Sequence, residues 1–71
     1  MDDQPTTLWA LEREGHTARC QVKLVTYGIE IILAQDGEEM VTRVFETGEE
    51  ALAWAAKKRT DREAAGWTTP A

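Results

Sequence analysis

The stretch Tyr27-Gly-Ile-Glu-Ile-Ile-Leu-Ala-Gln-Asp-Gly-Glu-Glu-Met-Val-Thr-Arg-Val-Phe45 decides the fold of this chain. Two runs rich in β-branched residues lie on either side of Asp36-Gly37. Both residues of that pair tolerate positive φ angles, as a two-residue type I′ turn requires. The pattern therefore predicts a β-hairpin, to which the segments before and after it are expected to add.

Two segments before the hairpin extend the predicted sheet. Residues 7–13 meet residues 17–25 across Glu14-Gly15, and the second segment alternates apolar and polar residues as a half-buried strand does. A further turn at Tyr27-Gly28 joins it to the hairpin. With these turns, one inner face carries a single set of side chains: Trp9, Leu11, Ala18, Cys20, Val22, Leu24, Ile29, Ile31, Leu33, Met40, Thr42 and Val44.

The register of the three hairpins follows from the same turns. We expect Leu11 opposite Ala18, Leu24 opposite Ile31, and Leu33 opposite Met40. A slip by one residue in any hairpin moves its apolar side chains to the other face of the sheet. The agreement of three independent turns on one inner face is the main support for a meander.

A helix after the hairpin covers the inner face. Thr47 and Glu50 form a capping box, which predicts a helix over residues 48–65. Gly66 suits a left-handed residue after the helix, with Trp67 as its hydrophobic partner. The inner stripe of the helix is predicted to hold Ala51, Leu52 and Ala55 with the stems of Lys58, Arg59 and Arg62. The predicted fold is α+β, an antiparallel four-stranded β-meander with one C-terminal α-helix packed on one face.

Length and composition bound the class of protein. The 71 residues fit a loose leader over 1–6, a single domain over 7–67 and a frayed tail over 68–71. A chain this short buries only about 60% of the surface that it exposes when unfolded, so dimerisation would add stability. The single cysteine excludes an internal disulfide, and no apolar run suits a signal peptide or a membrane span. We therefore expect a cytoplasmic protein.

The charge is negative and unevenly distributed. Thirteen acidic and eight basic residues give a net charge of −5. Residues 1–50 carry eleven acidic and four basic residues, net −7, whereas residues 51–71 carry two acidic and four basic residues, net +2. This balance disfavours binding to a bare phosphate backbone and favours a basic partner. The acidic cluster gathers at the two ends of the meander, with Glu12, Glu14, Asp36, Glu38 and Glu39 at one end and Glu46, Glu49 and Glu50 at the other.

The residues with chemical potential give no catalytic, metal or cofactor site. His16 is the only histidine and has no partners for a catalytic triad, so we interpret it as a solvated turn residue. Cys20 is predicted to pack in the core opposite Trp9. The acidic run Asp36-Gly-Glu-Glu39 lacks the alternating oxygen ligands of a calcium loop. Trp54 flanks the helix and is expected either over the sheet edge or in contact with a partner.

The outer face of the sheet is more apolar than a solvated face requires. The predicted register places Ile32 opposite Val41 and Glu30 opposite Arg43, both pairs on this face. Adjacent apolar residues in the middle of a sheet are typical of a contact surface, although the chain termini are an alternative cover. The predicted partner interface comprises Lys23, Val25, Glu30, Ile32, Val41, Arg43 and Phe45.

Three segments resemble a group of short bacterial proteins of unassigned function. They are Trp9-Ala-Leu-Glu-Arg-Glu-Gly-His-Thr17, Arg43-Val-Phe-Glu-Thr-Gly-Glu-Glu-Ala-Leu-Ala-Trp54 and Gly66-Trp67. The resemblance extends over nearly the whole chain and implies a stand-alone bacterial protein, but it implies no activity and no site residues. The segment Thr47-Gly-Glu-Glu-Ala-Leu52 is also similar to the helix start of antitoxins of the HicB type, a common capping pattern.

Three function classes remain, and an enzyme is not among them. The first is a non-catalytic interaction protein that binds another protein or a second copy of itself through the outer face. The second is an acidic inhibitor that mimics nucleic acid, of the antirestriction or anti-CRISPR type, using the acidic cluster. The third, a DNA reader using Arg19, Gln21, Lys23 and Arg43, is disfavoured by the net charge. We predict a protein partner or homodimer, with no cofactor, small-molecule substrate, membrane or direct nucleic-acid binding.

Overall fold

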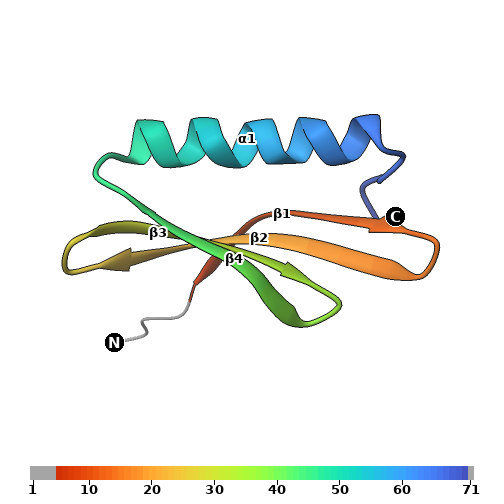
Figure 1. Cartoon of the computed structure of the whole chain (residues 1–71), viewed down its shortest axis with the longest axis horizontal. Helices are drawn as coiled ribbons and strands as arrows, with labels where there is room; N and C mark the ends of the chain where they lie inside the picture. Colours follow the sequence, from red (N-terminus) through yellow and green to blue (C-terminus); the bar gives the residue numbers. More distant parts are fainter. Residues whose placement is uncertain (1–4, 71) are drawn as a thin grey trace.

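The chain folds as a four-stranded antiparallel sheet covered on one face by a single helix (Figure 1). The computed structural model describes residues 5–70. The strands pair in chain order, β1-β2-β3-β4. The elements are β1 Thr6–Arg13, β2 His16–Val25, β3 Gly28–Gln35, β4 Glu38–Phe45 and α1 Gly48–Ala64. The predicted α+β meander with one C-terminal helix is confirmed.

The two ends of the chain fall only partly within the described residues. Residues 1–4 of the predicted leader lie outside them, and Thr6 already belongs to β1. Ala71, the last residue of the tail predicted to fray, also lies outside them. The first residue of that tail, Thr68, pairs with Glu12 of β1, a contact that the sequence did not predict.

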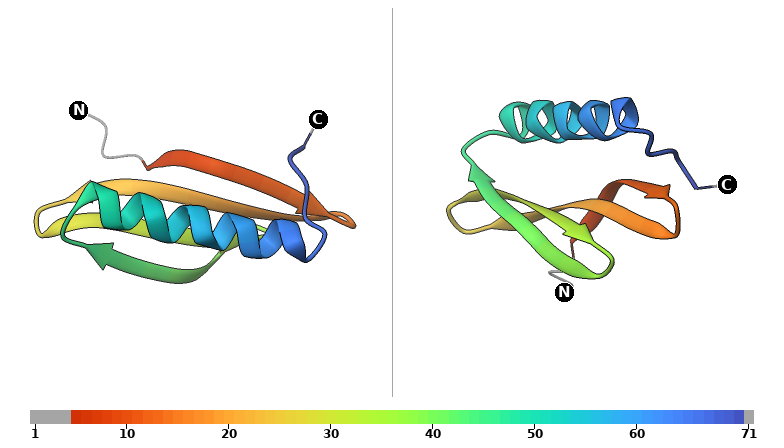
Figure 2. Two further views of the ribbon diagram at one scale, coloured as in Figure 1. Left: turned by 90° about the horizontal axis from the view of Figure 1, so that it is seen from above. Right: turned by 45° about the vertical axis from the view of Figure 1, so that its right-hand side comes forward.

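The core lies between α1 and the middle of the sheet, which the helix crosses on one side only (Figure 2). The indole Nε1 of Trp9 donates a buried 3.0 Å hydrogen bond to the carbonyl of Ala55, so a polar group in the core is satisfied and β1 is tied to the helix. The buried side chains are Trp9, Leu11, Ala18, Cys20, Ile31, Leu33, Ala51 and Ala55.

Two leucines predicted on the inner faces are exposed. Leu24 is 79% exposed and Leu52 is 54% exposed. The first residue of the helix, Gly48, lies against the side chain of Ile29. From there the helix packs mainly on β3 and β4. The end of β2 therefore receives little cover, and only Ala51 and Ala55 of the predicted helix stripe are fully buried.

Both ends of the helix follow the prediction. The Thr47 side chain accepts a 3.2 Å hydrogen bond from the backbone N–H of Glu50, as an N-cap does. At the other end Gly66 has φ +101°, and the N–H of Trp67 donates to the carbonyl of Arg62 at 3.0 Å. This is a Schellman ending, and it turns Trp67 back against the core.

The first and third turns are type I′. The central residues have positive φ in both: 48° and 82° at Glu14 and Gly15, and 52° and 86° at Asp36 and Gly37. The first turn sets the predicted pairing across β1 and β2, including Leu11 opposite Ala18. The sequence signal of an acidic residue followed by glycine is therefore confirmed at both places.

The second turn lies one residue earlier than predicted, at Thr26-Tyr27. The pairing of β2 with β3 consequently shifts by two residues, and Ile31 lies opposite Val22 instead of Leu24. Side chains alternate with a period of two, so a shift of two leaves each of them on its predicted face. The predicted pairs were wrong, but the predicted faces of β2 and β3 hold.

Gly28 is the first residue of β3, and the close approach of the β4 backbone requires a glycine at this position. Its φ is +149°, and a Cβ there would collide with the carbonyl oxygen of Phe45. The side chain of Val44 would lie 3.2 Å from the same Cβ. The glycine is therefore used for close approach of two strands, and not for the turn that the sequence suggested.

The fourth strand contains a β-bulge that reverses the predicted faces. The register of β3 and β4 shifts between Leu33 and Ala34, so Leu33 lies opposite Val41 and the predicted pair with Met40 is wrong. From Val41 onward every side chain of β4 lies on the face opposite to its prediction. The residues concerned are Val41, Arg43 and Phe45, which lie on the helix side, and Thr42 and Val44, which lie on the outer face.

The bulge has a physical reason in the packing of Phe45. On the helix side this ring is half-buried and contacts Trp54 with 5.7 Å between ring centroids. A phenylalanine buries more apolar area than the valine next to it in the chain, so exposing Val44 and covering Phe45 is favoured. The cost is one residue, Met40, left out of the regular pairing and exposed.

Candidate functional site

The two edges of the sheet differ in what lies beside them. Along β1, the N–H of Glu12 donates to the carbonyl of Thr68 at 2.7 Å, and the N–H of Thr68 donates back at 3.0 Å. Along β4, no segment within residues 5–70 pairs with the outer side of the strand. Nearly all side chains of β4 are exposed as well. The strand therefore presents unpaired backbone groups to any chain that can align with it.

The open backbone groups belong to Thr42 and Val44. The carbonyl of Phe45 points toward β3, where it lies against Gly28. Residues of an antiparallel ladder alternate between bonding one neighbouring strand and facing away from it. By this alternation Arg43 bonds toward β3, and the N–H and C=O groups of Thr42 and Val44 point away from the sheet.

The two halves of β4 are unequal. The first half contains the bulge at Met40 and the carboxylates of Glu38 and Glu39, and both features discourage strand pairing. The second half, residues 41–45, is regular and mostly apolar. We name this second half, with its outward backbone groups, the open edge.

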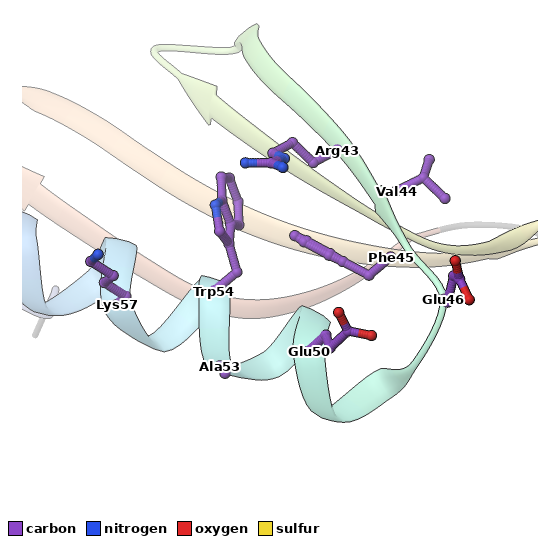
Figure 3. A pocket seen from close by; sticks show the side chains of 8 residues that line it. All are labelled: Arg43, Val44, Phe45, Glu46, Glu50, Ala53, Trp54 and Lys57. Atoms are coloured by element: carbon purple, nitrogen blue, oxygen red, sulfur yellow. The ribbon is translucent and has the colours of Figure 1, made fainter.

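A groove with a volume of about 590 Å³ lies between the open edge and α1 (Figure 3). Its walls come from the end of β4 and from the first turns of the helix. The lining residues are Arg43, Val44, Phe45, Glu46, Glu50, Ala53, Trp54 and Lys57. A chain paired with the open edge would thus direct alternate side chains toward this groove.

Arg43 and Trp54 form the centre of the groove. The guanidinium carbon of Arg43 lies 5.5 Å from the centroid of the Phe45 ring and 5.7 Å from that of the Trp54 ring. The ammonium of Lys58 lies 5.2 Å from the same Trp54 ring. These cation–π contacts hold the aromatic side chains in place with a cationic group beside them. The arrangement suits apolar and acidic groups.

The charges of the groove are separated along its length. Figure 3 shows Lys57 toward one end and the carboxylates of Glu46 and Glu50 toward the other, with Arg43 beside the rings of Trp54 and Phe45 between them. All four charged side chains are exposed. The groove therefore has no net charge but a basic end and an acidic end.

The bulge divides the predicted partner interface between the two faces of the sheet. Val41, Arg43 and Phe45 lie on the helix side, so their predicted place on the outer face is wrong. Arg43 also lies opposite Ile31, and the predicted Glu30–Arg43 cross-strand pair does not form.

The rest of that interface keeps its predicted face. Glu30 lies opposite Lys23 on the outer face, and Val25 and Ile32 share that face by the same alternation. Ile32, the predicted centre, is only 7% exposed. A partner placed on the outer face would therefore find little of this side chain, so the outer face is a weaker candidate than the open edge.

The acidic cluster is divided between the two ends of the sheet. The β1–β2 and β3–β4 turns lie at the same end (Figure 1), and Asp36 joins them by accepting a 2.9 Å hydrogen bond from the N–H of Thr17. Glu12, Glu14, Glu38 and Glu39 are exposed at or near these turns, and Glu46, Glu49 and Glu50 are exposed near the helix start. The carboxylates therefore form two separate groups, one at the turns and one at the helix start, as the sequence predicted.

His16 is engaged in a turn contact. Its Nδ1 lies 2.8 Å from Oδ2 of Asp36, and both side chains are exposed. The backbone N–H of Thr17 and then the His16 side chain lower the pKa of the Asp36 carboxyl below its ordinary value. His16 is thus part of the connection between two turns, where the sequence predicted only a solvated side chain.

Cys20 lies in the core as predicted, fully buried opposite Trp9. Burial raises the pKa of its thiol from 9.0 to about 11, although the charge of Arg62 acts in the opposite direction. A thiol with so little thiolate at neutral pH is a poor nucleophile. Within residues 5–70, no group of three or more His, Cys, Asp or Glu side chains is arranged to hold a metal ion.

Sequence reasoning missed the open edge because it missed the bulge. Nothing in the residues around Met40 marks an extra residue, since the preceding turn and the following alternation both look regular. A usable signal was present in the aromatic pair Phe45 and Trp54, which lie on either side of a tight connection to the helix. Requiring these two rings to meet would have reversed the predicted faces of β4.

Comparison with known proteins adds no relative. No protein-family model matches the chain, and neither does any curated protein or solved structure. The resemblance to short bacterial proteins therefore stays a prediction. Among residues 5–70 the only helix is too short and too polar to cross a membrane.

Proposed function

We propose that the protein is a non-catalytic protein-binding module whose partner adds an extended segment to the open edge of β4. The observation that carries the proposal is the outward direction of the backbone groups of Thr42 and Val44. A strand added there gains main-chain hydrogen bonds on one side without disturbing the pairing of β4 with β3. This replaces the outer sheet face as the proposed contact surface.

The groove supplies the side-chain selectivity of such a module. In strand addition, backbone hydrogen bonds give affinity and pockets for alternate side chains give specificity. Here alternate side chains of the added strand meet Phe45 and Trp54, with the guanidinium of Arg43 beside them. We expect the bound segment to carry an aromatic or aliphatic residue at the centre of the groove and an acidic residue next to Arg43.

A proline at position 44 tests the proposal without breaking the fold. The N–H of Val44 faces away from β3, so Val44→Pro removes an outward donor and leaves the internal ladder complete. Val44→Ala is the matched control, because it shortens the same side chain and keeps the N–H. Immobilised wild type, Val44→Ala and Val44→Pro would be compared for captured proteins by quantitative mass spectrometry. We expect partners shared by wild type and Val44→Ala to be lost from Val44→Pro.

The proposal would be contradicted if folded Val44→Pro captured the same proteins as the wild type. Thermal unfolding of each variant establishes that it is folded. A partner that Val44→Pro retains at undiminished level uses another surface, since strand addition at the open edge loses a main-chain hydrogen bond in this variant.

The acidic cluster supports a second candidate function, mimicry of nucleic acid toward a basic protein. Its support is the exposure of Glu38 and Glu39 beside the turn that holds Asp36. The double variant Glu38→Gln and Glu39→Gln removes two negative charges from that end. In the same capture experiment, loss of a nucleic-acid-binding protein from this variant but not from Val44→Pro would favour mimicry over strand addition.

A further inference from the structure

The charges of the groove are arranged as a self-complementary pattern. Its basic end, with Lys57, and its acidic end, with Glu46 and Glu50, lie on either side of the centre formed by Phe45, Trp54 and Arg43 (Figure 3). A two-fold axis through the centre exchanges the two ends. A second copy of the chain, turned about such an axis, would therefore set each basic end against an acidic end.

From this pattern we infer that the open edge pairs with the open edge of a second copy, the two β4 strands running antiparallel about a two-fold axis at Val44. The inference rests on the proposed function and names the partner of that same surface. Two copies of the sheet would join into one continuous sheet of eight strands. Both helices would lie on the same face of it, because a two-fold axis perpendicular to the sheet keeps the faces in place.

The bulge fixes where the axis lies. An axis at Thr42 would place Val44 opposite Met40 of the second copy, in the bulged part of the strand. An axis at Arg43 would pair residues whose backbone groups already bond toward β3. With the axis at Val44, the two Val44 residues exchange backbone hydrogen bonds, and Thr42 pairs with Glu46 of the second copy. This register avoids the bulge: residues 43–45 of the two strands pair with each other, and Glu46, the partner of Thr42, lies just after the strand end.

The side chains agree with this register on the helix side. Arg43 would lie opposite Phe45 of the second copy, so each guanidinium gains an aromatic neighbour across the interface. The two α1 helices would run antiparallel beside each other. Glu50 of each helix would then lie toward Lys57 of the other, an ion pair that salt weakens because both side chains are exposed.

The interface is small, so the dimer should be weak. A short strand pair with one groove is below the roughly 1,200 Å² that stable complexes bury. We expect dissociation constants on the order of tens of micromolar, which correspond to a transient complex. The concentration range of the experiment follows from this estimate.

Disulfide trapping tests the axis directly. Val44 is 42% exposed on the outer face, and a Val44→Cys side chain would meet its symmetry mate across the axis at a separation that a disulfide spans. Wild type carries only the buried Cys20 and serves as the blank. Leu24→Cys is the matched control, because Leu24 is also an exposed apolar residue but lies on β2, two strands away from the open edge. Under mild oxidation at tens of micromolar, we expect covalent dimers from Val44→Cys only.

Equal cross-linking of Val44→Cys and Leu24→Cys, or none from Val44→Cys, would overturn the inference. A Thr42→Cys variant that cross-links in place of Val44→Cys would also overturn the stated axis. Val44→Lys gives a second readout that needs no oxidation, since it sets two ammonium groups against each other on the axis. Sedimentation should show a concentration-dependent dimer for the wild type and a monomer for folded Val44→Lys.

This inference and the proposed function can fail separately. If the wild type sediments as a monomer at hundreds of micromolar, the second copy is excluded as partner. The proposed function still stands in that case if another protein is captured by wild type and lost from Val44→Pro. If self-association persists undiminished in Val44→Pro, strand addition at the open edge is excluded both for the second copy and for the proposed function.

Discussion

The edge of β1 is paired at Glu12 with the returning chain, whereas no segment within residues 5–70 pairs with the second half of β4. The contrast follows from how each edge meets the helix. After α1, Gly66 turns the chain back toward β1, Trp67 packs on the core, and Thr68 pairs with Glu12. Between β4 and α1, only Glu46 and Thr47 intervene, too few residues to return along the strand.

The two edges of one small sheet therefore differ in how their outward backbone groups are satisfied. Both edges carry backbone groups that invite pairing with another chain. At β1 the N–H and C=O groups of Glu12 are satisfied within the chain, by Thr68. At β4 a bulge and two glutamates obstruct the first half only, so unpaired outward groups are confined to the short segment 41–45.

The largest effect should come from filling the space at Gly28, which brings β4 close to β3. Gly28→Ala places a Cβ against the Phe45 carbonyl at a φ of +149°, and we expect it to lower the free energy of unfolding by about 2 to 3 kcal/mol. Gly37→Ala is the control, because Gly37 also has a positive φ but has open space around it. Urea unfolding of both variants measures the difference. Equal losses would mean that close approach of β4 is not the cause.

Removing the aromatic side chain beside the open edge should have the next largest effect. Trp54 contacts Phe45, Arg43 and Lys58, so Trp54→Ala is expected to lower the free energy of unfolding by about 2 kcal/mol. Leu52→Ala, two residues away and exposed, should cost less than about 0.5 kcal/mol. A large loss at Leu52 with little at Trp54 would place the packing of the helix elsewhere.

One substitution made at both edges tests the comparison itself. Thr68→Pro removes the N–H that donates to Glu12 and should cost about 1 kcal/mol of stability. Val44→Pro removes an N–H that points to solvent and should cost less. Thermal unfolding of the two variants would show the opposite order if the β4 amide were bonded within the chain.

The smallest effect concerns the end of the sheet where the first and third turns meet. The pKa of Asp36 is lowered in the folded state, so its ionised form adds stability at neutral pH. That contribution is present above the unfolded-state pKa and is lost as the pH falls through the lower, folded-state pKa. The melting temperature of Asp36→Asn should therefore decrease less steeply than that of the wild type as the pH is lowered in the acid range. Parallel curves for wild type and variant below pH 4 would contradict this.

The sequence was sufficient for the fold and for most of the side-chain faces. Local sequence rules were enough at Glu14-Gly15, at Asp36-Gly37 and at the Thr47 N-cap, and each of these predictions was confirmed. At Tyr27-Gly28 the same local rule failed because tertiary contact with Phe45 needs the glycine in the strand.

The candidate site was not predicted from the alternation along β4, because it depends on one unpaired residue that this alternation does not mark. The bulge at Met40 exchanges the faces of Arg43 and Phe45 with those of Thr42 and Val44. The bulge is stabilised by the contact of Phe45 with Trp54, which joins a strand to the helix. A pattern of period two along β4 carries no information about that helix.

Amide hydrogen exchange, followed residue by residue by NMR at several protein concentrations, tests the central claim most directly. In dilute solution we expect the amides of Thr42 and Val44 to exchange at nearly unprotected rates, while that of Glu12, bonded to Thr68, is protected. At high concentration, protection should rise at Thr42 and Val44 and remain unchanged at Glu12. Protected Thr42 and Val44 amides in the dilute protein would contradict the account, because the edge of β4 would then be closed.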